Sequence, residues 1–279
     1  MKMAGPAVPI SETAGGSRET SSHIRARRLR VQSRVRDALI TACGAASIFA
    51  LWYGVVAGFH VQEFIAPLPT RVVQVFVSEW PLISKNFVPT MMACVLGFTF
   101  GSLTGVLVAI TFIHFSVVRT AYFPIAVFFN TIPILAIAPI LVLIFGLGLL
   151  PKVIVAGLIC FFPVLVNMLR GLEAVRPSEL ELMRMLSASE WEVFLRLRLP
   201  RALPYLFSAL RIVATTSVIG AIVGEWIGSD AGLGALIIQS AFNYRSPLLY
   251  ATIFASSSLA IAQFSLVVIL ERRIIRWVG

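Results

Sequence analysis

The sequence predicts an all-α polytopic membrane protein with six transmembrane helices. Of its 279 residues, 58% are hydrophobic and only 13% are charged, whereas a soluble globular domain carries about a quarter charged residues. Six apolar stretches reach the length of about 20 residues that a helix needs to cross the hydrocarbon core. Lipid offers no hydrogen-bond partner to exposed backbone groups, so we expect these stretches to be helical.

The predicted spans follow a polar, basic tail at residues 1–36, which we expect to be partly disordered. The remaining residues, 37–279, form the six-span domain, and a cytoplasmic helix pair is expected in the loop at 173–202, between spans four and five. Pro124, Pro133 and Pro139 lie in the third span, where proline removes hydrogen bonds and bends a helix. The six spans are predicted at residues 38–59, 87–113, 122–145, 153–169, 203–223 and 247–270.

Lysine and arginine are distributed unevenly between the two sides of a six-span path. Eighteen of the 23 lie on the side that holds both termini and the 173–202 loop. Arg211, near the start of span five, has a side chain long enough to reach that interface. Cytoplasmic loops carry an excess of basic residues, so we expect both termini to be cytoplasmic. The opposite side holds only Arg71, Lys85, Lys152 and Arg245.

The net charge of +10 is therefore interpreted as orienting the chain in a lipid bilayer, and nucleic-acid binding is not expected. Cys43, Cys94 and Cys160 each lie in an apolar run and are interpreted as packing residues. No metal-ligand spacing occurs. A membrane enzyme would need clustered acids, bases or metal ligands near one face. No such cluster is present, so we expect neither an enzyme nor a cofactor bound by this chain.

Small and polar residues within the spans indicate where helices pack or a path runs. Glycines recur at four-residue intervals in span two (97, 101 and 105) and from span five onward (220, 224 and 228). Such stripes let two helix backbones approach closely. Packing within one bundle is the favoured interpretation, and a dimer or moving interface is the alternative.

Polar side chains in mid-membrane usually face protein or a water-filled cavity. Asn130 and Thr131 in the bent third span, and Thr215 and Thr216 in the fifth, are the candidate translocation-path residues. Hydrogen bonding between helices is the alternative. No acidic residue lies in the middle of a span, although a proton-driven transporter usually uses a buried carboxylate or histidine.

The loop between spans four and five carries signals for two short helices. Ser178 with Glu181, and Ser189 with Glu192, fit the S-x-x-E capping box. They predict helices at about 179–187 and 190–198, the second ending at Pro200. The loop holds more apolar side chains than so short a segment can shield. Such exposed groups usually mark a partner surface, and a helix in the membrane interface is the alternative.

These residues resemble the EAA motif of permease subunits in bacterial ATP-binding-cassette (ABC) importers, written E-A-A-x3-G-x9-I-x-L-P. In that family the motif forms the coupling helix that contacts the ATPase. Leucine and methionine replace its two alanines here, and serine replaces its glycine. The residues that match the motif positions, and that the resemblance assigns to ATPase coupling, are Glu181, Leu182, Met183, Ser187, Leu197, Leu199 and Pro200.

The resemblance extends over about 38–276. Residues 224–253 are similar to the branch that takes up nitrate, sulfonates, taurine, and vitamin precursors such as hydroxymethylpyrimidine or riboflavin. It implies a multi-pass permease of the bacterial inner (plasma) membrane, paired as a homodimer or with a similar permease. ATPase subunits that use ATP-Mg and an extracytoplasmic solute-binding protein are the implied partners. An ATP-independent secondary transporter or channel is the alternative.

The sequence contains no G-x-x-x-x-G-K-[ST] motif, and its only lysines are Lys2, Lys85 and Lys152. Phosphate binding by a P-loop is therefore not expected in this chain. Any hydrolysis of ATP is expected on a separate subunit.

Overall fold

The computed structural model describes residues 36, 39–40, 42–44, 46–227 and 229–275. The chain divides into two compact units, residues 1–61 and 62–279. The described part of the first unit contains the short apolar helix Ala42–Gly58. Apart from Arg36, the predicted tail at 1–36 lies outside the described residues, so its predicted disorder is not tested.

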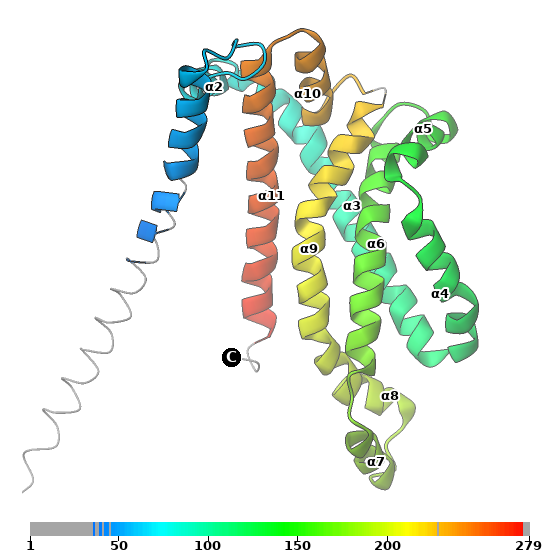
Figure 1. Ribbon diagram of the computed structural model, residues 1–279. Helices are drawn as coiled ribbons and strands as arrows, with labels where there is room; N and C mark the ends of the chain where they lie inside the picture. Colours follow the sequence, from blue (N-terminus) through cyan, green and yellow to red (C-terminus); the bar gives the residue numbers. More distant parts are fainter. Residues whose placement is uncertain (1–35, 37–38, 41, 45, 228, 276–279) are drawn as a thin grey trace, which may run out of the picture. The chain divides into compact units, whose positions relative to one another are not determined.

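The second unit is helical throughout its described part (Figure 1). Short helices connect or cap the long ones at both ends of the bundle. In chain order the elements are α2 (Pro69–Ser78), α3 (Trp80–His114), α4 (Ser116–Thr131), α5 (Ile134–Phe145), α6 (Leu149–Glu173), α7 (Pro177–Met185), α8 (Glu190–Val193), the π-helix η1 (Phe194–Arg198), α9 (Leu199–Trp226), α10 (Leu233–Phe242) and α11 (Ser246–Ile274).

Four helices of the described residues are long and apolar enough to cross a membrane: α3, α6, the continuous helix Glu190–Trp226, and α11. They correspond to the predicted spans two, four, five and six. Helices α4 and α5 together make a fifth candidate, bent by 97°. The all-helical class is thus confirmed, and the count of six spans stays a prediction because Ala42–Gly58 is shorter than a full span.

The bend between α4 and α5 follows from proline chemistry. Pro133 is the N-cap of α5, and Ile132 before it has φ −70° and ψ 126°. The ring of a proline disfavours the helical conformation of the preceding residue. Pro124 and Pro139, by contrast, lie inside α4 and α5. The predicted break in the third span is confirmed at Pro133.

Both glycine stripes pack against α6. A Cβ atom on Gly101 of α3 would lie 2.8 Å from the Cα atom of Gly157, and one on Gly220 of α9 would lie 2.8 Å from the Cα atom of Ala156. At such separations only glycine fits, because a methyl group needs ordinary van der Waals distance. Close packing within one bundle is therefore confirmed for these positions, and Gly228 lies outside the described residues.

Charged groups join the helices at each end of this bundle. Helices α7 and α8 lie at the same end as the α3–α4 connection and the C-terminal end of α11 (Figure 1). At that end Arg119 pairs with Glu173, and the Arg211 side chain lies 3.4 Å from the Glu271 carboxylate. The Arg245 guanidinium donates to Glu79 at 2.7 Å and links the starts of α11 and α3.

Candidate functional site

Helix α7 begins earlier than the sequence predicts. It starts at Pro177, and the N–H of its N-cap, Arg176, donates to the Glu179 carboxylate at 3.0 Å. The predicted box of Ser178 with Glu181 is therefore wrong. Proline favours the first helical position because its fixed φ suits a helix and that position needs no N–H donor. This placement makes Glu179 the third helical residue.

The second predicted box is confirmed. The N–H of Ser189 donates to the Glu192 carboxylate at 3.0 Å, and the N–H of Glu192 donates to Ser189 Oγ at 3.3 Å. Helix α8 accordingly begins at Glu190. Reciprocal bonds of this kind fix where a helix starts, so the entry of the chain into α8 is well defined.

Ser187, at the glycine position of the motif, has a left-handed backbone. Its φ is +55°. The N–H of Ser187 donates to the carbonyl of Arg184 at 2.9 Å, and the N–H of Ala188 donates to that of Met183 at 3.0 Å. This pair of bonds is the Schellman arrangement that ends helices, usually on glycine. The turn that the sequence predicts near Ala188 therefore forms, with a serine in the conformation that favours glycine.

Pro200 does not end the second helix, contrary to the prediction. Helix α8 continues through η1 into α9, so residues Glu190–Trp226 form one helix. In η1 the N–H of Leu199 donates to the carbonyl of Phe194, five residues earlier. Such a π-turn shifts the hydrogen-bond register by one residue. Pro200 then occupies one of the first two positions of α9, where its missing N–H is tolerated.

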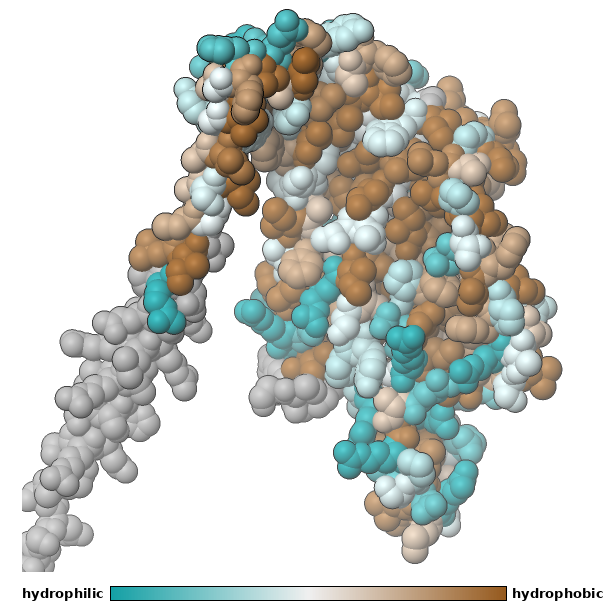
Figure 2. All heavy atoms as spheres, in the orientation of Figure 1, coloured by the Kyte–Doolittle hydropathy of each residue, from teal (hydrophilic) through white to brown (hydrophobic). Residues whose placement is uncertain are grey.

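Apolar side chains are exposed on the protruding pair α7 and α8. Figure 2 shows apolar surface at the tip of this protrusion, beside hydrophilic side chains. Met185 is 83% exposed, which is close to the exposure of a free chain. Exposed apolar clusters usually mark interaction sites. We call Leu182, Met185, Leu186 and Trp191 the α7–α8 face; all four are exposed.

The glutamates of this loop differ in their partners. Glu179 accepts from Arg176 and pairs with Arg201 of α9. Glu192 caps α8 and lies 3.9 Å from Arg196. Glu181 is exposed and bonds to none of the described residues. The carboxylate that matches the motif is therefore not used within this part of the chain.

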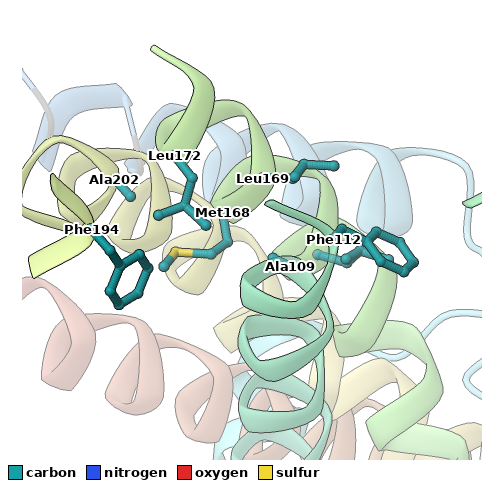
Figure 3. Close-up of a cluster of buried hydrophobic side chains, with 8 residues drawn as sticks. Ala109, Phe112, Met168, Leu169, Leu172, Phe194 and Ala202 are labelled. Atoms are coloured by element: carbon teal, nitrogen blue, oxygen red, sulfur yellow. The ribbon is translucent and has the colours of Figure 1, made fainter. Parts of the chain in front are cut away.

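A buried cluster connects α8 and η1 to the bundle (Figure 3). Phe194 of η1 packs in it with Met168 and Leu172 of α6, and Leu199 of the motif lies against the same cluster. The Trp191 ring of the α7–α8 face stacks on Phe194, with ring centroids 5.4 Å apart. The same cluster contains Ala109 and Phe112 of α3 and Ala202 of α9. Close packing therefore connects Trp191, through Phe194, to three long helices.

The predicted path residues do not meet in one cavity. Asn130 lines a cavity of about 410 Å³ between α4, α5 and α6, to which no α9 residue contributes. The Thr131 hydroxyl donates to the carbonyl of Phe128 at 2.7 Å. Thr215 and Thr216 donate to the carbonyl of Ile212. Their role along a path stays a prediction.

The sequence did not reveal a buried polar cluster between α3, α9 and α11. The Cys94 thiol donates to the Gln263 side-chain carbonyl at 2.6 Å, and Gln263 donates to the Ser217 hydroxyl at 3.2 Å. Ser217 in turn donates to the carbonyl of Ala214 at 3.1 Å. Each donor has an acceptor, which stabilises the contact of three helices in an apolar setting. Cys94 is thus hydrogen-bonded rather than a simple packing residue.

A second buried cluster lies at the opposite end of the bundle from α7. Glu225 is 1% exposed and Lys152 is 8% exposed. The charge distribution placed Lys152 in a loop, but it lies in α6, and its ammonium group donates to Ser229 Oγ at 2.6 Å. The Thr90 hydroxyl donates to Glu225 at 2.8 Å. The signal available in the sequence was a glutamate shortly before the closely spaced Gly232 and Gly234.

The described residues thus form a helical bundle in which an exposed helix pair leads into one of the long apolar helices. The chain belongs to the family described as the binding-protein-dependent transport system inner membrane component, which matches residues 97–276. This confirms the family that the loop and the 224–253 segment predict.

Several relatives have names that specify a cargo, and these cargoes are formylaminopyrimidine, riboflavin, aliphatic sulfonates and taurine. The formylaminopyrimidine transport permease protein ThiX of Halalkalibacterium halodurans is 32% identical over 217 residues, which cover 77% of this chain and 87% of ThiX. The riboflavin transport system permease protein RibX of Chloroflexus aurantiacus is 29% identical over 235 residues, covering 82% and 87%. Such relatives are transport permeases, and their named cargoes lie in the predicted branch.

Solved structures show the same fold. A chain of the MetNI methionine ABC transporter in an inward facing conformation aligns with a TM-score of 0.54 and 22% identity, covering 77% of this chain and 99% of that chain. The family match and the permease relatives, rather than this likeness in fold, show that the chain is an inner-membrane permease component of an ABC transport system.

Proposed function

We propose that this permease carries a small solute inward across the bacterial inner membrane, and that its α7–α8 face binds an ATPase subunit that hydrolyses ATP-Mg. The exposure of Met185 and its neighbours on a protruding, hydrogen-bonded helix pair is the observation that supports the proposal. Burying one such side chain contributes about 1.5–3 kcal/mol. Glu181, which has no partner within the described residues, adds a carboxylate for a basic group of the ATPase.

The proposed coupling follows the continuous helix that starts at Glu190. A displacement of α8 moves η1 and α9, because the three form one helix. Phe194 passes the same displacement to α3 and α6 through the buried cluster. Nucleotide and solute then bias a bundle with two states, outward-open and inward-open. Two permease copies, a solute-binding protein outside the membrane, and both termini in the cytoplasm complete the proposal.

For the cargo we propose a neutral, planar vitamin precursor rather than an inorganic anion or a sulfonate. The cavity beside Asn130 is lined by apolar side chains, Phe129, Phe161 and Phe162 among them, and no charged side chain contributes to it. Aromatic walls with one amide suit an uncharged ring that both stacks and accepts a hydrogen bond. The named cargoes of ThiX and RibX support the same class.

Co-purification with a candidate ATPase subunit, co-expressed with this chain, tests the docking proposal. We expect Leu182→Ser with Met185→Ser to weaken binding at least tenfold, since about 1.4 kcal/mol corresponds to a factor of ten and two apolar anchors are lost. Val117→Ser is the matched control, because Val117 is 80% exposed on α4 and lies outside the α7–α8 face. Unchanged binding of the double variant, or equal loss in the control, would overturn the proposal.

Uptake into proteoliposomes tests the energy source. We expect labelled pyrimidine precursor to accumulate only with an ATPase that hydrolyses ATP. Accumulation that persists with an ATPase inactivated at its P-loop lysine would instead indicate an ATP-independent transporter or channel.

A further inference from the structure

Helix α10 begins at a point where three backbone donors meet three side chains from other helices. The N–H of Gly232 donates to Asn86 Oδ1 at 2.9 Å, that of Leu233 to Thr90 Oγ1 at 2.7 Å, and that of Gly234 to the Glu225 carboxylate at 2.7 Å. The first N–H groups of a helix have no partner within it. Those of α10 are instead satisfied by α3 and α9.

A fourth side chain holds the segment before α10. The Lys152 ammonium group of α6 donates to Ser229 Oγ at 2.6 Å and to the carbonyl of Ala231 at 3.2 Å. We call Asn86, Thr90, Lys152 and Glu225 the α10 anchor. It links three long helices to one short one. Two of its members are charged groups buried in a membrane protein, an expensive arrangement that usually marks function.

The glycines make this contact possible. A Cβ atom on Gly232 would overlap the Glu225 carboxylate, and one on Gly234 would lie 2.6 Å from the carbonyl of Ile222. Gly232 also has φ +124°, a backbone conformation that residues with a side chain rarely adopt. At Gly232 and Gly234 the backbone at the start of α10 therefore lies directly on α9, with no side chain between them.

The later part of α10 makes no side-chain hydrogen bond to another helix among the described residues. Only Leu233, Gly234, Leu236 and Ser240 of its ten residues are buried, and the buried Ser240 hydroxyl has no hydrogen-bond partner among the described residues. The helix leads into a tight turn in which Tyr244 has φ +54°. The hydrogen bonds from other helices therefore lie at the start of α10, and the turn lies at its end.

We propose that α10 is a lid over the end of the bundle opposite α7, and that the α10 anchor is the latch that keeps it closed. Helix α10 packs on α3, α9 and α11, the three helices that share the Cys94, Ser217 and Gln263 cluster. Release of the anchor lets α10 swing about the turn near Tyr244 and opens this end. In transport, this opening acts as the outer gate, and that role rests on the proposed function. The latch is a property of this chain alone, so it can be tested without the ATPase.

Thiol labelling of a buried position on α10 tests the latch. The probe is Ser240→Cys, since Ser240 is 2% exposed, in a chain with Cys43→Ser to remove the exposed native thiol. The full chain is placed in lipid nanodiscs without ATPase. A water-soluble maleimide is added, and labelling rates are read for each cysteine by mass spectrometry.

We expect Thr90→Val combined with Glu225→Gln to accelerate labelling at position 240 at least tenfold, because hydrogen bonds to two buried backbone donors are weakened or lost. Thr90→Ser alone keeps the hydroxyl and is expected to label at the parent rate. Glu79→Gln is the matched control. It weakens the exposed Arg245–Glu79 ion pair near the same end of the bundle and leaves the anchor intact, so it too should label at the parent rate.

Buried Cys94 and Cys160 report on general unfolding. Acceleration confined to position 240 supports the latch. An unchanged rate in the double variant, an equal rise in Glu79→Gln, or an equal rise at all three cysteines would overturn it. Because no ATPase is present, these outcomes are independent of whether the α7–α8 face docks one.

Discussion

Ser187, which has a left-handed backbone at the end of α7, leads to the prediction that substitution by glycine raises the stability of this turn. Replacing a side chain by glycine within a helix normally destabilises it. Ser187, however, has φ +55° at the C′ position of a Schellman turn. A left-handed conformation costs a residue with a side chain about 1–2 kcal/mol, and glycine adopts it without that cost. Ser187→Gly should therefore stabilise the α7 end.

The size of the effect follows from two opposing contributions. Relief of the left-handed backbone contributes about 1–2 kcal/mol. The greater freedom of glycine in the unfolded segment takes back about 0.4–1 kcal/mol. The net gain is about 0.5–1 kcal/mol, and about 1 kcal/mol corresponds to a fivefold change in a local opening equilibrium.

Amide hydrogen exchange measures this local opening directly. The amide of Ala188, which donates to the carbonyl of Met183 at 3.0 Å, should gain about two- to fivefold protection in Ser187→Gly. Ser178→Gly is the matched control, because Ser178 lies in the first turn of α7, where glycine costs about 0.5 kcal/mol relative to serine. It should lose protection. If both variants change protection in the same direction, the reasoning from the left-handed turn is wrong.

Three further variants test the packing and the caps. Gly101→Ala should lower the thermal midpoint in detergent through overpacking that costs about 1–3 kcal/mol. Gly54→Ala should not lower it, because a Cβ atom there would have nothing within 4 Å. Equal midpoints for the two variants would contradict the close approach of α3 to α6. Gln263→Leu should destabilise the bundle by about 1–3 kcal/mol, since it removes the two buried hydrogen bonds that join Gln263 of α11 to Cys94 of α3 and Ser217 of α9. An unchanged midpoint would show that these two bonds contribute nothing. Ser189→Ala should cost about 1 kcal/mol through loss of the α8 cap, measured as faster amide exchange confined to residues 190–193; unchanged exchange there would argue against the cap.

Much of the fold follows from patterns that the sequence displays openly. Long apolar runs locate the helices, because lipid leaves the backbone few alternatives. The break at Pro133 and the close packing at Gly101 and Gly220 follow from proline and glycine, whose constraints are local. The Ser189 cap is local as well. The break and the cap depend on residues near one another in the chain, so the sequence was sufficient to predict them. The glycine spacing shows which helix faces can approach a neighbour, but not that the neighbour is α6.

The two wrong predictions in the 173–202 loop concern positions where two local constraints on helix ends compete. Ser178 with Glu181 has the spacing of a capping box, but Pro177 fixes the first helical position and gives the role to Glu179. Pro200 was expected to end a helix, but the π-turn at η1 changes the hydrogen-bond register before it. In both cases the neighbouring residues decide which rule applies.

The buried polar clusters depend on residues far apart in the chain. Thr90 and Glu225 are separated by 135 positions, and Cys94 and Gln263 by 169. Nothing near either member indicates its partner. In the sequence, Lys152 and Glu225 each lie one or two positions outside a predicted span, at 153–169 and 203–223. Only the packing of α3, α6, α9 and α10 shows that both are buried.

Photo-cross-linking at Met185 tests most directly whether the α7–α8 face docks an ATPase. A photoreactive amino acid placed there, in the full chain co-expressed with its ATPase in bacterial membranes, should yield an adduct with the mass of permease plus ATPase. The same group at Val117, which is 80% exposed in the first turn of α4, should yield none. Adducts at Met185 only with lipid or with a second copy of this chain would contradict the proposed coupling.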